Sequence, residues 1–376
     1  MGAWRHSADG HRGRTGLEDR LMRDIGDLLQ RYLDEGFHFT DANLSPGEPI
    51  LYRGAGGFEA SKSAPLTLDE IEHFIASPDL GGENWRQRMR ENRNTLEMAC
   101  TFGQARLRCS VYETGGSAHT LRIAIRRQPL DVPPLETIGA PPNITKMLGR
   151  GKGLVLITGP TGAGKTTTMA ALLDWINRRI PLHIQTIEQP IEYVHKRDKC
   201  VISQSEVPEN SPSFAAGVEA ALRHRPDIIA IGEILNRETV SAALHAATSG
   251  HLVIGTMHTN SCEDTIGAIL QFYDGEEGEQ RRATLATALV GIVSQVLIPS
   301  HDKKKLHLAS EILFCNDTIS RLIQQNKVRQ IANAMRDDRE YGMSLLNDSI
   351  NMLWASQKIS LRAAMRASYD PSGVGV

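Results

Sequence analysis

The sequence has no excess of charge of either sign. Its 42 lysine and arginine residues face 44 aspartate and glutamate residues, mixed along the chain, for a net charge of −2. Proteins that bind nucleic acid directly carry a basic patch or a basic tail. The charge balance therefore gives no support to direct nucleic-acid binding.

Long apolar runs and paired cysteines are also missing. No stretch approaches the roughly 18 consecutive apolar residues of a membrane-spanning helix. The start, MGAWRHSADGHRGRTG, has charge and glycine where a secretory signal needs an apolar core. The five cysteines contain no C-x-x-C pair, which argues against a zinc ribbon or a disulfide framework. We expect a cytoplasmic protein with reduced, packed thiols.

What the chain does contain is material for two domains in its 376 residues. Five prolines fall between positions 129 and 142, too many for a helix or a central strand, so this stretch is predicted to be an interdomain linker. The predicted organisation is disorder in 1–16, an N-terminal α/β domain in 17–128, the linker in 129–142, a nucleotide-binding core in 143–300 and a helical C-terminal subdomain in 301–376.

The N-terminal domain is predicted from short periodic segments. Apolar residues at helical spacing from Leu17 to Tyr32 indicate a helix that ends near Gly36, and residues 50–58 read as a glycine-broken strand. Thr67 and Glu70 are spaced as a capping box that opens a second helix.

A β-hairpin is predicted at the end of this domain. Residues 106–111 and 121–126 alternate between polar and apolar side chains around a Gly115-Gly116-Ser117 turn. The polar faces collect Arg106, Arg108, Arg122 and Arg126. These arginines contact phosphate across a subunit interface, or they form a solvated basic face.

Residues 153–176 form the centre of the chain's organisation. An apolar run leads into Gly159-Pro160-Thr161-Gly162-Ala163-Gly164-Lys165-Thr166, which fills the pattern G-x-x-x-x-G-K-[ST], and a helix-periodic segment follows. Glycines let backbone N–H groups surround phosphate oxygens, and the helix directs its positive end at the same anion. We predict that residues 159–167, Thr167 included, bind ATP, with Lys165 at the β/γ-phosphates and the Thr166 hydroxyl on Mg²⁺.

The rest of the core alternates short apolar strands with helices. Predicted strands at residues 154–157, 184–187, 228–231 and 252–256 indicate a largely parallel sheet, whose carboxyl ends should hold the ligand. From Thr284 onward, apolar residues through Val296 predict a helix ended by Pro299. A strand at 307–314 and several helices complete the C-terminal prediction.

Acidic residues follow two of these strands. The run DIIAIGE ends at Glu233, which we predict to be the catalytic base that acts on water, with capping of the next helix as the alternative role. TIEQPIEY places Glu188 and Glu192 where they could hold Mg²⁺, Glu188 directly or through water. The alternative for this pair is a solvated turn before an edge strand.

Histidines flank another predicted strand, in TSGHLVIGTMHTNS. His258 lies at the end where the nucleotide is expected and His251 at the other end. An imidazole can donate a hydrogen bond to a phosphate oxygen and lose that partner after hydrolysis. His258 is therefore a candidate phosphate sensor, although a histidine in such a place is often only a packed residue.

Four segments in this order resemble the PilT-type ATPases of the type II and type IV secretion and pilus motors. GLVLITGPTGAGKTTT resembles the family's Walker A, TIEQPIEYVH its Asp box, RPDIIAIGE its atypical Walker B, and TSGHLVIGTMHTNS its His box. ISRLIQQNK is similar to a C-terminal segment of the retraction-type members. The likeness runs from about Asp41 to Trp354.

The resemblance implies an α/β fold with a RecA-like P-loop ATPase core, a smaller PAS-like N-terminal domain and a helical C-terminal subdomain. It also implies a homohexameric ring in which each N-terminal domain packs on its neighbour's nucleotide domain, and in which Arg108 and Arg126 act at the bound nucleotide. Two features depart from the family pattern. Gln189 replaces an aspartate that pilus retraction members carry in the Asp box, and the four-cysteine metal site of assembly-type members is absent.

The expected function is that of a cytoplasmic hexameric motor. It would couple Mg·ATP hydrolysis to movement between its domains and act with inner-membrane components, which would hold it at the cytoplasmic face of that membrane. Residues 203–226 resemble the DotB/TraJ branch, which favours a type IV secretion or conjugation apparatus over the alternative, a type IV pilus retraction ATPase. A P-loop kinase would need a phosphoacceptor pocket, and the sequence contains no recognisable one. A purely structural ring would not need Glu233.

Overall fold

The computed structural model describes residues 23–34, 41–54, 57–78, 80–102, 105–115, 120–128, 131–302 and 305–375. The expectations for residues 1–16, for Leu17 and Gly36 as helix ends, and for the turn at 116–117 lie outside these ranges. The chain divides into two compact units, Met1–Arg127 and Gln128–Val376. All five cysteines are buried and form no disulfide.

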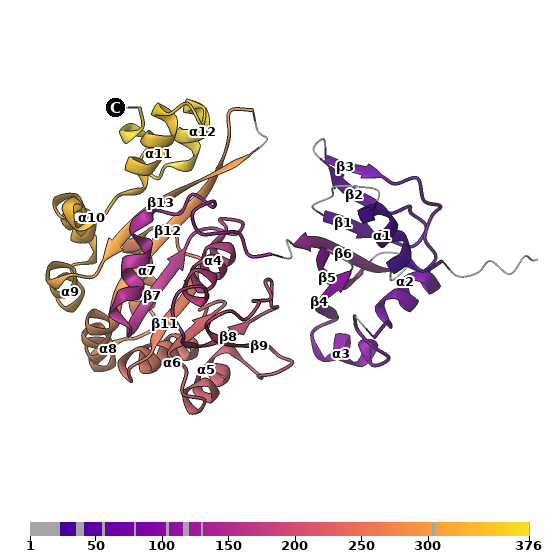
Figure 1. Ribbon diagram of the computed structural model, residues 1–376, viewed down its shortest axis with the longest axis horizontal. Coiled ribbons are helices and arrows are strands. Elements are labelled where there is room, and N and C mark those ends of the chain that lie inside the picture. Colours follow the sequence, from indigo (N-terminus) through magenta and orange to yellow (C-terminus); the bar gives the residue numbers. More distant parts are fainter. Residues whose placement is uncertain are drawn as a thin grey trace, which may run out of the picture. The chain divides into compact units, whose positions relative to one another are not determined.

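The first unit is a six-stranded sheet with helices on one face (Figure 1). The strand order is β3-β2-β1-β6-β5-β4. Its strands are β1 (Asp41–Leu44), β2 (Leu51–Gly54), β3 (Gly57–Ala60), β4 (Thr95–Phe102), β5 (Ala105–Thr114) and β6 (Thr120–Gln128), and its helices are α1 (Ile25–Asp34), α2 (Leu68–Ile75) and α3 (Trp85–Glu91).

The alternation of apolar and polar residues along β5 determines which face of the sheet the helices cover. Leu107, Cys109 and Val111 are fully buried against the three helices, whereas Arg106 and Arg108 point to the other face. The predicted hairpin with its arginines on the polar face is therefore correct. None of the described helices of this unit packs into the arginine face.

The predicted capping box at α2 is also present. The Thr67 hydroxyl accepts the Glu70 N–H, and the Glu70 carboxylate accepts the Thr67 N–H. The same carboxylate forms an ion pair with Arg23 over 2.7 Å. Burial by itself would raise the pKa of Glu70, but the hydrogen bonds from Arg23 and Thr67 outweigh it and lower the pKa to about 2.

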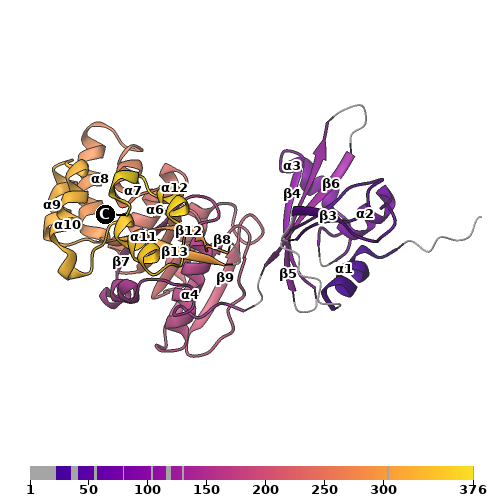
Figure 2. The ribbon, with the colours of Figure 1, turned by 90° about the horizontal axis from the view of Figure 1, so that it is seen from above.

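The second unit is a seven-stranded sheet between two layers of helices (Figures 1 and 2). The order is β13-β12-β7-β11-β10-β8-β9, and the strands pair in parallel except for β13, which runs antiparallel to β12. The strands are β7 (Gly153–Thr158), β8 (His183–Glu188), β9 (Val201–Glu206), β10 (Ile228–Ile231), β11 (Leu252–Met257), β12 (Leu289–Pro299) and β13 (Leu306–Phe314). This arrangement is an α/β fold with a RecA-like core.

The central strands are apolar because both of their faces are covered. Leu154 and Leu156 of β7 pack in one core with residues of α5 to α8, and Val155 and Ile157 pack in another with α4. The helices of these layers are η1 (Pro142–Arg150), α4 (Lys165–Asn177), α5 (Phe214–Arg223), α6 (Arg237–Thr248), α7 (Cys262–Leu270) and α8 (Gly275–Ala288).

The helix predicted from Thr284 to Pro299 is wrong from Leu289 onward. Helix α8 ends at Ala288, and residues 289–299 form strand β12, hydrogen-bonded to β7 on one side and to β13 on the other. A strand that is buried on both faces is largely apolar, so its residues also satisfy a helical spacing. The frequent β-branched residues between positions 290 and 298 were the available signal for a strand.

Most of the proline-rich segment from residue 131 onward packs on the second unit. Leu135 is buried in the core next to α4, with Val132 and Ile138 against the same cluster. After Phe314 the chain is helical, as α9 (Asp317–Gln324), η2 (Val328–Gln330), α10 (Ile331–Asp337), η3 (Arg339–Tyr341), α11 (Leu346–Ala355), α12 (Leu361–Ala367) and η4 (Pro371–Gly373). Among the described residues, no helix combines the length and apolarity needed to cross a bilayer.

Candidate ATPase site

The sheet register brings the predicted site residues of the second unit to the carboxyl ends of its strands. Thr158, the last residue of β7, pairs with Met257 of β11, so the phosphate loop and His258 leave the sheet side by side. On the next strands, Ile231 of β10 pairs with both β11 and β8, and Glu188 and Glu233 follow at the same edge. Parallel strands that end together place their following residues around a single crevice.

The loop between β7 and α4 needs its glycines for both space and conformation. Gly159 has φ +145°, and a Cβ there would lie 2.2 Å from the Gln295 carbonyl oxygen of β12. Gly162 and Gly164 have φ +80° and +82°. Only glycine adopts these values without strain, so the sequence pattern is explained by local geometry.

The Lys165 ammonium group contacts the backbone of its own loop. Its Nζ donates to the carbonyl oxygens of Gly159 at 2.9 Å and Pro160 at 3.2 Å, and it lies 3.3 Å from His258 Nδ1. An ammonium has three donors, and these contacts engage all three. Burial lowers the pKa of Lys165, and the negative charges of Glu233 and Glu192 oppose that shift.

His258 connects Lys165 to Glu233. Its Nε2 contacts the Glu233 carboxylate, while its Nδ1 faces the lysine. Because Lys165 can only donate, Nδ1 accepts, and the ring proton lies on Nε2, from which it is donated to Glu233. Helix α6 is capped by Asn236, whose side chain accepts the Thr239 N–H, so capping of that helix does not depend on Glu233.

The Asp-box segment is tied into the sheet and to the loop helix. Glu188 is 6% exposed, and its Oε1 accepts hydrogen bonds from Thr186 at 2.7 Å and Gln204 at 3.1 Å. Burial raises the pKa of Glu188. A solvated turn is therefore the wrong description of this carboxylate. Tyr193 adds a contact that the sequence did not identify, since its hydroxyl lies 3.1 Å from that of Thr167.

The oxygen donors near the loop suit Mg²⁺ held jointly with a nucleotide. Among the described residues, no group of three or more His, Cys, Asp or Glu side chains converges as a metal site. Mg²⁺ bound with nucleotide phosphates takes only one or two protein oxygens and keeps several waters. The Thr166 hydroxyl, at the first turn of α4, and nearby carboxylates such as Glu192 fit that requirement.

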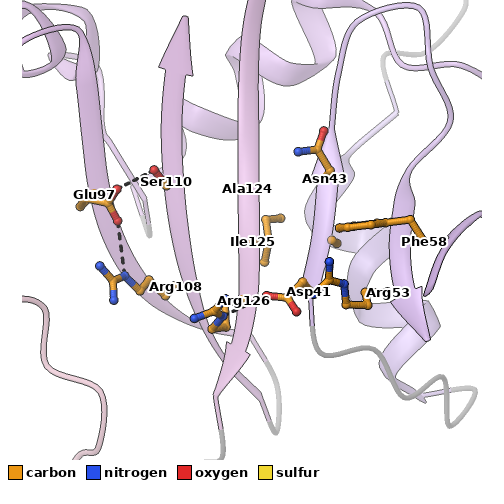
Figure 3. Close-up of a pocket in the computed structure, with 11 residues that line it drawn as sticks. Asp41, Asn43, Arg53, Phe58, Glu97, Arg108, Ser110, Ala124, Ile125 and Arg126 are labelled. Carbon is orange, nitrogen blue, oxygen red and sulfur yellow. Dashed lines mark hydrogen bonds and ion pairs between the residues drawn. The ribbon is translucent and has the colours of Figure 1, made fainter. Parts of the chain in front are cut away.

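Of the four candidate arginines, Arg108 and Arg126 line a pocket on the first unit. Figure 3 shows this pocket, of about 400 Å³, on the open face of the six-stranded sheet. Arg108 pairs with Glu97 over 3.4 Å, and Arg126 pairs with Asp41 over 2.9 Å. The Arg126 side chain is 67% exposed, which leaves its guanidinium accessible to a further anion.

Comparison with known proteins defines the class of this enzyme. The family model described as type II/IV secretion system protein matches residues 95–359, and the chain belongs to that family. Its members hydrolyse ATP, and the chain is accordingly an ATP-binding, ATP-hydrolysing enzyme.

Individual relatives include a twitching motility protein and a type IV pilus retraction ATPase. The chain is 38% identical over 309 residues to a twitching motility protein of Neisseria gonorrhoeae, covering 81% of this chain and 80% of the relative. It is 34% identical over 351 residues to the type IV pilus retraction ATPase PilT of Pseudomonas aeruginosa, covering 93% and 99%.

Among solved structures, a PilT motor is also more similar to this chain than a DotB ATPase is. A crystal structure of the pilus retraction motor PilT with bound ADP aligns with TM-score 0.83 at 35% identity, covering 94% of this chain and 99% of that one. The ATPase DotB of Legionella pneumophila aligns with TM-score 0.79 at 26% identity, covering 92% and 96%. The expected preference for the DotB/TraJ branch is therefore not supported, and the alternative fits these relatives better.

Proposed function

We propose that the protein is a hexameric pilus-retraction-type motor ATPase. The observation that carries this proposal is end-to-end similarity to PilT, which spans 99% of that protein at 34% identity. ISRLIQQNK, the segment similar to retraction-type members, lies in helix α9 and the turn after it. A DotB-like secretion motor is the second candidate, because DotB aligns over 96% of its own length.

In the proposed reaction, the phosphate loop first binds ATP. Phosphate oxygens would replace the carbonyl oxygens of Gly159 and Pro160 as acceptors for Lys165, because an anion is a stronger acceptor for an ammonium than a neutral carbonyl. Mg²⁺, held by Thr166 with Glu188 or Glu192 directly or through water, would neutralise charge that develops on the phosphates.

Glu233 is proposed as the base that orients and deprotonates the attacking water. Its contact with His258 gives the step a switch. Once Lys165 turns to the nucleotide, His258 loses its donor at Nδ1 and becomes free to exchange Glu233 for a phosphate oxygen. The carboxylate is then available for water only after the loop is filled.

The ring and its partners extend this proposal. Arg108 and Arg126 would act on the nucleotide of an adjacent subunit, since both lie on the open face of the first unit. In a movement between the units, the proline-rich segment from residue 131 onward would move with the second unit, because it packs there. The motor would work at the cytoplasmic face of the inner membrane through membrane-embedded pilus components.

The proposal is tested by replacement in a pilus-bearing host that lacks its own retraction ATPase. Expression of this chain should restore surface twitching, and the Lys165→Ala chain should not. A parallel host lacking its DotB-type ATPase distinguishes the second candidate. Restored secretion without restored twitching would overturn the pilus assignment.

A further inference from the structure

A buried glutamine of β12 contacts the phosphate loop from behind. Gln295 is 1% exposed and lies on the strand that pairs in parallel with β7. Its Nε2 donates to the Ala163 carbonyl oxygen at 2.6 Å, and its Oε1 accepts from the Thr168 hydroxyl at 3.0 Å. Ala163 lies in the loop, two residues before α4 begins, and Thr168 lies in the first turn of α4.

The two partners fix the orientation of the amide. A carbonyl oxygen can only accept, so the amide nitrogen must face Ala163. The oxygen then faces Thr168, whose hydroxyl is free to donate. Both ends of a side chain with no access to water are thus satisfied by the loop and its helix.

The backbone of the same residue sets the position of the loop's beginning. The Gln295 carbonyl oxygen occupies the space that a Cβ on Gly159 would need, at 2.2 Å. At the other end of the loop, a Cβ on Gly164 would lie 3.5 Å from Gln295 Nε2. One residue therefore contacts the start of the loop by its main chain and the end of the loop by its side chain.

We propose that Gln295 is a positioning residue that holds the phosphate loop in its nucleotide-binding conformation before ATP arrives. It does not touch the nucleotide and acts through Ala163 and Thr168. A loop that is already ordered pays less conformational entropy when it binds, so affinity rises without any new contact. The proposal rests on ATP binding by this family and is independent of the pilus role.

The position of β12 gives this contact a wider consequence. The strand pairs with β13 on its far side, and α12 packs against it, while α11 packs against β13. Gln295 links this C-terminal part of the sheet to the loop and to the first turn of α4. A shift of β12 would therefore be felt at the loop through two hydrogen bonds.

The first test is Gln295→Met in the full-length protein, which keeps similar volume and removes both hydrogen bonds. We expect its Kd for a fluorescent, non-hydrolysable ATP analogue to rise about tenfold, the order expected when two ordinary hydrogen bonds are lost. Gln185→Met is the matched control. Gln185 is a buried glutamine of β8 that bonds to Ser205, away from the loop, and its variant should bind the analogue normally.

Thr168 provides a second arm that leaves Gln295 in place. Thr168→Val should raise the Kd severalfold, and Thr168→Ser, which keeps the hydroxyl, should restore it. Combining Thr168→Val with Gln295→Met should weaken binding no more than Gln295→Met alone, because the two share one interaction. Additive effects, or normal affinity in a folded Gln295→Met or Thr168→Val protein, would overturn the proposal. An equal loss of affinity in Gln185→Met would do the same.

Discussion

Lys165 Nζ lies 3.3 Å from His258 Nδ1, although 93 positions separate the two residues in the chain. Parallel pairing of β7 with β11 brings them together, because each residue follows the end of its strand. The lysine donor also decides the histidine tautomer, and the imidazole then donates to Glu233. The candidate phosphate-binding cation, the candidate sensor and the candidate base therefore form one hydrogen-bonded chain before nucleotide binds.

Lys165→Ala should abolish ATP hydrolysis and leave the fold intact. The side chain is held by polar contacts at the loop and not by the apolar core, so its loss removes a charge and opens no large cavity. Turnover and the thermal unfolding midpoint are the two measurements. Near-normal turnover would contradict the assignment of Lys165.

Glu233→Gln should bind ATP with about wild-type affinity and hydrolyse it on the order of 10²–10⁴ times more slowly, the usual cost of losing a general base. The amide keeps the shape of the side chain but cannot take a proton from water. Single-turnover measurement on bound ATP separates chemistry from binding. Lost binding with a normal rate per bound ATP would instead make Glu233 a structural or Mg²⁺-holding residue.

His258→Ala should still bind nucleotide, because Lys165 and the backbone N–H groups of the loop remain in place to contact the phosphates. The loss of one ordinary hydrogen bond changes affinity by about tenfold or less. Without the imidazole, however, the subunits should adopt the same arrangement with ADP as with a non-hydrolysable ATP analogue. Small-angle scattering of both states measures this. A variant that still responds as the wild type does would move the sensor to another residue, with Glu188 the next to test.

Arg126→Ala and Arg108→Ala test action between subunits. Each variant alone, and Lys165→Ala alone, should hydrolyse ATP poorly. Mixed rings of an arginine variant and the Lys165 variant should regain activity, because some interfaces then combine an intact loop with an intact arginine. A mixture of wild-type and Lys165→Ala chains gives the dilution baseline. Mixtures no more active than their parents would indicate that these arginines do not act on the nucleotide of an adjacent subunit.

The first unit should lose stability in acid through Glu70. Its pKa is lowered from the ordinary 4.5 to about 2 in the folded state. The stabilisation is therefore fully present above pH 4.5 and declines as pH falls towards 2. Hydrogen exchange of the α2 amides, compared at pH 6 and pH 3, measures it. Glu70→Gln should exchange faster at pH 6 and show a smaller change between the two pH values, whereas Glu91→Gln, at an exposed glutamate, should behave as the wild type.

Several elements of both units were predictable from the sequence, because each is specified by residues that are close together in the chain. The strand, loop and helix around Lys165, the strands that precede Glu188, Glu233 and His258, and the capping box at Thr67 each have a short-range pattern. The contacts between these elements were not predictable in the same way. They depend on strand order, which the periodicity of single segments does not contain.

Gln295 shows where this limit matters most. The apolar run around it was assigned to a helix, which would have left its amide without a defined partner. Only the pairing of β12 with β7 places that amide behind the phosphate loop. Tyr193 was missed for a related reason, since its contact with Thr167 joins a loop after β8 to the helix after β7.

The antiparallel pairing of β13 with β12 limits how far the chain can be shortened. The sequence placed residues 301–376 in a separate subdomain, yet β13 covers the edge of β12 from Gly291 to Pro299. A chain that stopped at Ser300 would expose the free backbone groups of an apolar strand, which is a template for aggregation. It would also loosen the strand that holds Gln295 against the loop. The smallest soluble catalytic fragment of this enzyme should therefore extend at least through Phe314.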